Sequence, residues 1–171
     1  MIQIRERDLS ARELFSLAER AAGVATDAKS RLLINDRADA AASIGCGVHL
    51  TTRSLPASAV RGAFGPDMLI GASTHNIEEA DAAEGGGADF IVFGPVFETE
   101  SKKAYGPPVG LGALRAAALR SQIPVLALGG IKETNFQYAL GAGAAGVAAI
   151  SLFTEADDLE ALVRRIKNFE R

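Results

Sequence analysis

Two short apolar runs that end in glycine constrain the fold of this chain most. Residues 90–93 read Phe-Ile-Val-Phe and are followed by Gly94. Residues 125–128 read Val-Leu-Ala-Leu and are followed by Gly129 and Gly130. Apolar runs without polar alternation are typical of parallel strands that are covered on both faces. Because glycine at a strand end lets backbone amides approach a phosphate closely, the two runs predict strand ends that hold a phosphorylated small molecule.

Strand and helix signals alternate along the whole chain. Strands are predicted at residues 1–5, 31–35, 47–50, 68–72, 89–93, 123–128 and 146–150. Helices are predicted at residues 11–22, 38–43, 57–63, 76–84, 111–119, 132–139 and 156–169. Because each strand is followed by a helix, we expect a single α/β domain over residues 1–171, a TIM-type (β/α)8 barrel of which seven β/α units are visible. An open doubly wound sheet is the alternative, and it is disfavoured because the glycine fingerprint of nucleotide binding is missing.

Composition excludes several classes of protein. The chain has 171 residues, of which 48% are hydrophobic and 23% are charged, as in a globular domain with a sizeable core. The net charge of −3 gives no electrostatic footprint for nucleic acid. Apolar stretches are too short to span a bilayer, and the N-terminus does not read as a signal peptide, so no membrane partner is expected. One cysteine fits a reducing compartment, and we expect a cytoplasmic protein.

Polar residues at the ends of the first two predicted strands suit an anion and a hard cation. Gln3, Arg5 and Arg7 alternate and therefore share one side of an extended segment, where two guanidinium groups can bind a di- or triphosphate. Asn35 and Asp36 end the second strand, and their oxygens suit Mg²⁺. A solvated chain start is the alternative for the arginines, and capping of the next helix is the alternative for Asp36.

Histidine and serine lie on the third and fourth predicted strands. His49 lies inside an apolar run and is interpreted as a core histidine. Ser73 follows an apolar run and could donate to a phosphate. His75 is either an acid or base or a residue that only hydrogen-bonds locally.

The last three predicted strands end in hydroxyl, amine and glycine groups. Thr99, Ser101 and Lys102 place three donors within four residues after the fifth strand, which favours an anion-binding loop. Gly129–Gly130 and Ser151 end the sixth and seventh strands. TIM-type barrels commonly build a phosphate site at these two strand ends, so a phosphate is expected beside them.

Seven short motifs follow one another in order and at fitting spacings. They are Gln3-Ile4-Arg5-Glu6-Arg7, Leu33-Ile34-Asn35-Asp36, Gly47-Val48-His49-Leu50, Gly71-Ala72-Ser73-Thr74-His75, Gly94-Pro95-Val96-Phe97-Glu98-Thr99, Gly129-Gly130-Ile131 and Ala149-Ile150-Ser151. Through these motifs the chain resembles the thiamine phosphate synthase and TenI family over nearly its whole length. The resemblance implies a (β/α)8 barrel and a transferase that joins hydroxymethylpyrimidine pyrophosphate to thiazole phosphate and releases pyrophosphate.

The resemblance also implies a role for each motif residue. In that family the pyrophosphate leaves first, assisted by Mg²⁺, and the thiazole nitrogen captures the pyrimidine cation. Gln3, Arg5 and Arg7 would hold the pyrimidine pyrophosphate, Asn35 would bind substrate, Asp36 would bind Mg²⁺, and Ser73 and Lys102 would hold the leaving pyrophosphate. Thr99, Ser101, Gly129, Gly130, Ile150 and Ser151 would form the thiazole phosphate side. Arg5, Ser73 and Lys102 are thus the predicted catalytic residues.

The chain departs from the family pattern at Arg7, where the family has Lys, and again after the third predicted strand. Thr52 and Ser54 stand where synthases have Gln and Asp, so Mg²⁺ loses a carboxylate, and Arg53 brings positive charge nearby. TenI proteins, which are thiazole tautomerases, also lack those synthase residues, but their pattern has a catalytic histidine where this chain has Pro95. A synthase is therefore the first interpretation. A TenI-like tautomerase and a non-catalytic binder of thiazole phosphate or thiamine phosphate are the alternatives.

The first strand and helix of the family are not visible ahead of Met1. Seven strands do not close the usual eight-stranded barrel, which leaves apolar strand edges near Gln3 and Ala148. We expect a second copy to cover them, which predicts a homodimer. Closure with seven strands and open edges are the alternatives, and the size of the protein in solution distinguishes the three.

Overall fold

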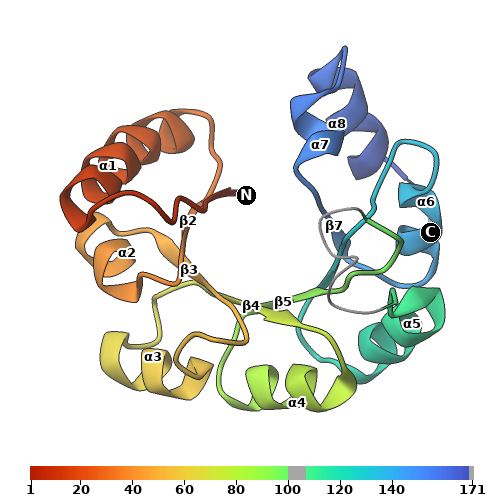
Figure 1. Ribbon diagram of the computed structural model, residues 1–171, viewed down its shortest axis with the longest axis horizontal. Coiled ribbons are helices and arrows are strands. Elements are labelled where there is room, and N and C mark those ends of the chain that lie inside the picture. Colours follow the sequence, from red (N-terminus) through yellow and green to blue (C-terminus); the bar gives the residue numbers. More distant parts are fainter. Residues whose placement is uncertain (100–106, 170–171) are drawn as a thin grey trace. The chain divides into compact units, whose positions relative to one another are not determined.

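The computed structural model describes residues 1–99 and 107–169, and within them strands and helices alternate (Figure 1). The strands are β1 (Ile2–Ile4), β2 (Leu32–Asn35), β3 (Gly47–Leu50), β4 (Ile70–Thr74), β5 (Phe90–Phe93), β6 (Val125–Leu128) and β7 (Gly146–Ala148). The helices are α1 (Ala11–Asp27), α2 (Ala38–Ile44), α3 (Ala57–Phe64), α4 (Ile77–Gly85), α5 (Gly110–Arg120), α6 (Phe136–Gly141), α7 (Ser151–Thr154) and α8 (Leu159–Lys167). The strand order is the sequence order, and the paired strands run parallel, which confirms the predicted β/α class.

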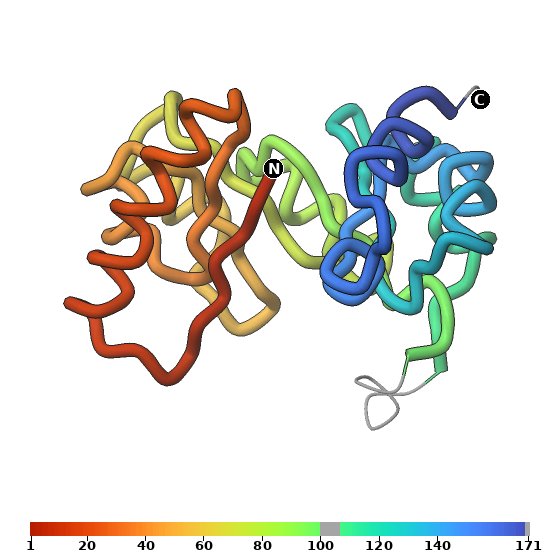
Figure 2. Tube along the Cα trace, turned by 90° about the horizontal axis from the view of Figure 1, so that it is seen from above, coloured from red at the N-terminus to blue at the C-terminus, as the bar shows by residue number. Residues whose placement is uncertain are grey.

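The contacts of the chain divide it into two compact units. Unit 1 comprises residues 1–73 and 85–89, and unit 2 comprises residues 74–84 and 90–171. Figure 2 traces the alternation of extended and helical segments within each unit. The single domain expected over the whole chain stays a prediction.

Unit 1 buries one face of its helices against β1 to β4. The core of this unit includes Leu14, Ala18, Leu32, Ile34, Val48, Val60 and Ile70, each at most 5% exposed. Helix α1 begins with a capping box, in which the Ser10 side chain accepts from the Glu13 amide and the Glu13 carboxylate accepts from the Ser10 amide. The helix ends at Asp27 rather than at residue 22, because the buried side chain of Ala25 keeps its last turn packed on the core.

Arg61 of α3 holds the turns at one end of unit 1 together. Its guanidinium donates to the carbonyl oxygens of Gly65, Pro66, Met68 and Gly87 at 2.7 to 3.1 Å. It also donates to Asp89 at 2.9 Å. Carbonyl oxygens at a helix end and in turns lack partners within regular structure, so one planar five-donor side chain satisfies several of them at once. We call this group the Arg61 clasp.

Unit 2 has its own core around β5 to β7. Ile91, Phe93, Leu114, Val125 and Leu162 belong to one buried cluster. Helices α5 and α6 lie beside their strands in this unit (Figure 1). No helix in the described ranges has the length and apolar character needed to cross a membrane.

Three predicted boundaries in unit 2 were wrong. Helix α6 begins at Phe136 rather than at residue 132, because the Asn135 side chain accepts from the Lys132 amide and keeps that segment in a turn. Strand β7 ends at Ala148, so Ile150 and Ser151 already belong to the start of α7. The predicted last helix begins at Leu159 rather than at residue 156, because the Asp158 side chain caps α8 by accepting from the Ala161 amide. The separate short helix α7 precedes it and was not predicted.

Candidate functional site

Two side-chain pairs lie at the carboxyl ends of the strands of unit 1. Gln3 Nε2 on β1 donates to Asn35 Oδ1 on β2 at 3.0 Å. His49 Nε2 on β3 lies 2.8 Å from Ser73 Oγ on β4. Asn35 also stands opposite His49 in the parallel register of β2 and β3. Three residues predicted for the site, Gln3, Asn35 and Ser73, are therefore engaged at the same strand ends.

His49 is the residue of this group that the sequence did not point to. It is 4% exposed, as expected of a core histidine, yet its partner is a predicted site residue. Burial, and then the positive charge of Arg5, lower the pKa of His49 to about 4. The imidazole is thus neutral at pH 7. Its position one residue before the end of β3 was the available signal.

The depressed pKa of His49 makes stability depend on pH. The unfolded chain binds a proton on this histidine below pH 6.5, whereas the folded chain does so only near pH 4, so stability is lost as the pH falls across that window. We expect protonation of His49 to lower the free energy of unfolding by about 2 kcal/mol when the pH falls from 7 to 5. Urea unfolding of the wild type and of His49→Gln at both values checks this. A wild-type loss no greater than that of the variant would contradict it.

Arg5 and Arg7 follow β1 and are exposed, as anion-binding side chains at a strand end would be. Asp36 is also exposed, and its backbone has a left-handed φ of 64°. Its amide donates to the His49 carbonyl oxygen at 2.9 Å. The N-cap position of α2 is Arg37, so the alternative that Asp36 caps this helix is wrong.

The surroundings of Asp36 do not fit a Mg²⁺ ion held by the protein alone. Ser54 Oγ accepts from the Thr51 amide at 2.8 Å and lies 3.1 Å from Thr51 Oγ1, so it serves a local turn. Across residues 1–99 and 107–169, no three His, Cys, Asp or Glu side chains gather as metal ligands. Mg²⁺ in enzymes is usually held by one or two carboxylates together with substrate phosphates, and the carboxylate of Asp36 is the one predicted here.

In unit 2 the turn after β5 packs on the turn after β6. The Val96 amide donates to the Leu128 carbonyl at 2.8 Å, and the Phe97 amide donates to the Gly129 carbonyl at 3.0 Å. A Cβ on Gly129 would lie 2.5 Å from Pro95 Cβ, and a Cβ on Gly130 would lie 2.3 Å from the Glu98 carbonyl oxygen. We call residues 94–99 with 129–130 the glycine cradle.

Close packing is the main reason why the cradle has glycines at these positions. Gly129 and Gly130 have φ values of +98° and +63°, which side chains other than glycine rarely adopt. Gly94 is equally constrained, since a Cβ there would lie 2.0 Å from the Leu128 carbonyl oxygen. The glycines therefore bring two turns into backbone contact, which is a different reason from the phosphate approach that the sequence suggested.

The remaining predicted residues have different surroundings. Thr99 is half-buried at the end of the cradle, and Asn135 Nδ2, which sequence reasoning missed, donates to the Gly130 carbonyl at 2.9 Å. Ile150 is 74% exposed, and Ser151 opens the single turn of α7. Ser101 and Lys102 lie outside the described residues.

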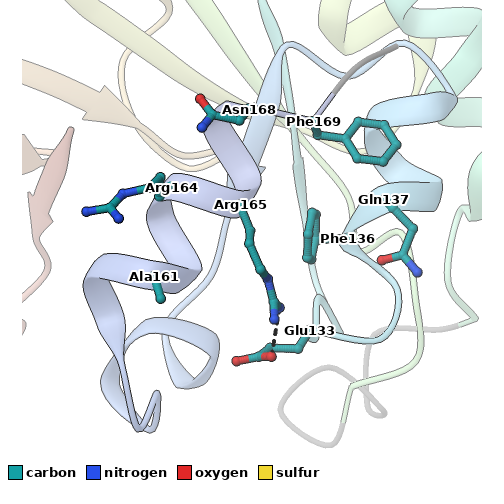
Figure 3. A pocket seen from close by; sticks show the side chains of 8 residues that line it. All are labelled: Glu133, Phe136, Gln137, Ala161, Arg164, Arg165, Asn168 and Phe169. Carbon is teal, nitrogen blue, oxygen red and sulfur yellow. Dashed lines mark hydrogen bonds and ion pairs between the residues drawn. The ribbon is translucent and has the colours of Figure 1, made fainter.

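A groove lies along α6 and α8 in unit 2 (Figure 3). Arg165 lies over the Phe136 ring at 6.0 Å and pairs with Glu133 at 2.8 Å, and Arg164 pairs with Glu160. Phe169 meets the edge of Phe136 with ring centroids 6.4 Å apart. Because both guanidinium groups already have carboxylate partners, this groove is a poor site for a phosphate.

Comparison with known proteins assigns the family. The family model described as "Thiamine monophosphate synthase" matches residues 1–153. The chain is 43% identical over 167 residues to "Thiamine-phosphate synthase" of Chlorobium luteolum, covering 97% of this chain and 79% of the relative. It is 40% identical over 166 residues to the protein of the same name from Methanospirillum hungatei, covering 96% and 81%.

A solved structure supports the same assignment. "Thiamine phosphate pyrophosphorylase from Pyrococcus furiosus" matches with a TM-score of 0.85 at 30% identity, over 96% of this chain and 79% of that chain. The match agrees with the TIM-type β/α fold that the strand and helix order predicts. The chain belongs to the thiamine monophosphate synthase family.

Proposed function

We propose that this protein is a cytoplasmic thiamine phosphate synthase. It joins hydroxymethylpyrimidine pyrophosphate to thiazole phosphate and releases pyrophosphate. The observation that carries the proposal is the pair Gln3–Asn35 beside His49–Ser73 at the strand ends of a chain from this family. The homodimer expected from the sequence stays a prediction, which a measurement of size in solution checks.

The Gln3–Asn35 pair suits an aminopyrimidine ring. The hydrogen bond uses one donor of Gln3 and the Oδ1 of Asn35. It orients the Gln3 Oε1 as an acceptor and the Asn35 Nδ2 as a donor for a ligand. An aminopyrimidine edge offers the complementary groups, an amino donor next to a ring-nitrogen acceptor. The pair would therefore hold the pyrimidine in a fixed rotation.

Arg5, Arg7 and Ser73 are proposed to receive the pyrophosphate. In the reaction the bond between the methylene carbon and the pyrophosphate oxygen breaks, and the electron pair leaves with the pyrophosphate. Two guanidinium groups and a hydroxyl donor stabilise the charge that develops on that oxygen. Lys102 is proposed for the same role on the basis of its motif. The carbon cation is then captured by the lone pair of the thiazole nitrogen.

The glycine cradle is proposed to bind the phosphate of the thiazole substrate. Its backbone is fixed by the hydrogen bonds that the Val96 and Phe97 amides and the Asn135 side chain donate, so it offers a rigid rim. Thr99, Ser101 and Ser151 would add hydroxyl donors, with Ile150 against the ring. A rigid rim costs little conformational entropy when the ligand binds.

The test is an assay of thiamine phosphate and pyrophosphate formation from the two purified substrates, with and without Mg²⁺. Turnover that is lost in Arg5→Met supports the proposal. Binding of thiazole phosphate without turnover would identify a non-catalytic binder instead. Isomerisation of the thiazole substrate alone would identify a tautomerase, which Pro95 disfavours because the histidine of that branch is missing there.

Binding of Mg²⁺ to the protein without substrate is expected to be weak. Asp36 has no carboxylate partner at Ser54, whose hydroxyl is engaged with Thr51. Ser54→Asp should strengthen Mg²⁺ binding by about 10-fold, since each added carboxylate supplies a charged oxygen ligand. Calorimetry with MgCl₂ measures this, and Ser54→Asn is the uncharged control. Tight binding by the wild type, or equal gains in both variants, would contradict the prediction.

A further inference from the structure

We infer that His75 is a positioning residue that fixes the glycine cradle through the Gly94 carbonyl. The inference deepens the proposed function, because the cradle is the part of unit 2 assigned above to the thiazole phosphate. His75 directly follows β4 and is half-buried. Its ring is not among the groups given a chemical role so far.

The backbone of His75 is held by the first turn of α4. The His75 amide donates to Glu79 Oε2 at 2.7 Å. The Glu79 amide in turn donates to Asn76 Oδ1 at 2.8 Å, and Asn76 Nδ2 donates to Glu79 Oε1 at 3.1 Å. These reciprocal bonds form a helix cap and leave the His75 backbone little freedom. The ring therefore projects from a fixed point.

The ring of His75 engages Gly94, where β5 ends. His75 Nδ1 lies within hydrogen-bonding distance of the Gly94 carbonyl oxygen. A carbonyl oxygen can only accept, so Nδ1 carries the hydrogen and, in the neutral ring, Nε2 has the lone pair. The Gly94 amide donates to the Thr74 carbonyl at 3.1 Å. Both polar groups of Gly94 are thus bound by two consecutive residues at the end of β4.

The position of Gly94 determines the positions of residues 95–98. Pro95, the next residue, packs against Gly129 with no room for a Cβ between them. Val96 and Phe97 then bond to the backbone of residues 128–129, and the Glu98 carbonyl fills the space beside Gly130. Residues 94–98 have little room to move, because their close contacts with residues 128–130 involve glycines that have no space for a Cβ. A shift of the Gly94 carbonyl is therefore passed along the segment to Gly130.

A positioning residue differs from a catalytic acid or base in what its side chain must supply. An acid or base must offer a proton or lone pair to the reacting atoms, whereas this role needs only a donor at the position of Nδ1. An asparagine side chain places its Nδ2 donor close to that position. His75→Asn should therefore preserve the role, and His75→Leu, similar in volume but without a donor, should remove it.

The first experiment is independent of any ligand. Amide hydrogen exchange of Val96 and Phe97 should become about 10-fold faster in His75→Leu and change less than about 3-fold in His75→Asn, as one hydrogen bond predicts. The Ile91 amide, which donates to the Pro124 carbonyl, is the internal reference and should not change. The ¹⁵N spectrum of the wild-type ring should show the hydrogen on Nδ1.

The second experiment uses thiazole phosphate as the probe. His75→Leu should weaken its binding and raise its KM by about 10-fold, whereas KM for the pyrimidine pyrophosphate and kcat change little. His75→Asn should bind within about 3-fold of the wild type. If both variants lose kcat with KM unchanged, His75 acts on the reacting atoms and the inference is overturned.

Three further results would also test the role of His75. Unchanged exchange in His75→Leu, or equal acceleration at Ile91, would overturn the inference, because the effect would then be absent or global. A hydrogen on Nε2 rather than Nδ1 would also overturn it. Failure of the wild type to bind thiazole phosphate sinks the proposed function, while the exchange pattern still decides the role of His75.

Discussion

Gly130→Ala is expected to weaken thiazole phosphate binding by about 100-fold, a loss of about 3 kcal/mol in binding free energy. The new Cβ would lie 2.3 Å from the Glu98 carbonyl oxygen and 2.8 Å from Phe97 Cβ, so the two turns of the glycine cradle must separate. The left-handed φ of +63° adds about 1 kcal/mol of backbone strain for any residue with a side chain. Calorimetry with thiazole phosphate measures the loss, and circular dichroism checks that the variant is folded.

Gly45→Ala is the matched control for this variant. Gly45 has a φ of +78°, and a Cβ there would have no heavy atom within 4 Å. The variant has the same backbone strain without the steric conflict, so it should lose about 1 kcal/mol of stability and bind thiazole phosphate normally. If folded Gly130→Ala also binds like the wild type, the phosphate site is not at the cradle.

Arg61→Met should lower the free energy of unfolding by about 3 kcal/mol. The Arg61 side chain is 21% exposed, and its guanidinium donates to four carbonyl oxygens as well as to Asp89. Methionine fills much of the space of the aliphatic stem but leaves these acceptors without their donor. Urea unfolding at pH 7 gives the difference directly.

Arg120→Met serves as the comparison for an exposed ion pair. Arg120 is 62% exposed and pairs with Asp81 at 2.8 Å, so its loss should cost no more than about 0.5 kcal/mol. Arg61→Lys should recover less than half of the loss, because an ammonium group cannot match the planar fork of donors. A loss in Arg61→Met as small as that in Arg120→Met would show that the Arg61 clasp contributes little.

The order of elements could be predicted from the sequence because buried parallel strands and capped helices have local signals. The structure contains such local signals in the capping box at Ser10 and in the cap that Asn76 forms at the start of α4. Boundaries failed where a side chain overrode the helical period, as at Asn135 and Asp158. The hydrophobic period of a sequence does not show which polar side chain will accept a hydrogen bond from the backbone of a turn. Such helix boundaries can therefore be placed only when the structure is known.

The candidate site was predictable one residue at a time but not as a set of contacts. Gln3 was found because it alternates with Arg5 and Arg7, and Asn35 and Ser73 were found because each follows an apolar run. The contact of His49 with Ser73 could not be foreseen, since it depends on the register of two strands. The Arg61 clasp was missed for the same reason, because Arg61 and Asp89 lie 28 residues apart.

The unequal burial of the two histidines means that one of them can be modified selectively by a reagent in the unaltered chain. The sequence has two histidines, and His49 is 4% exposed while His75 is half-buried. An acylating reagent is attacked by an imidazole nitrogen whose lone pair solvent can reach, and in His75 that lone pair is on Nε2, because Nδ1 donates to the Gly94 carbonyl. Mass spectrometry of the acylated protein should therefore find the imidazole label on His75 rather than on His49. Protection of that one residue by added substrate gives a footprint of the β4 end in the unaltered chain.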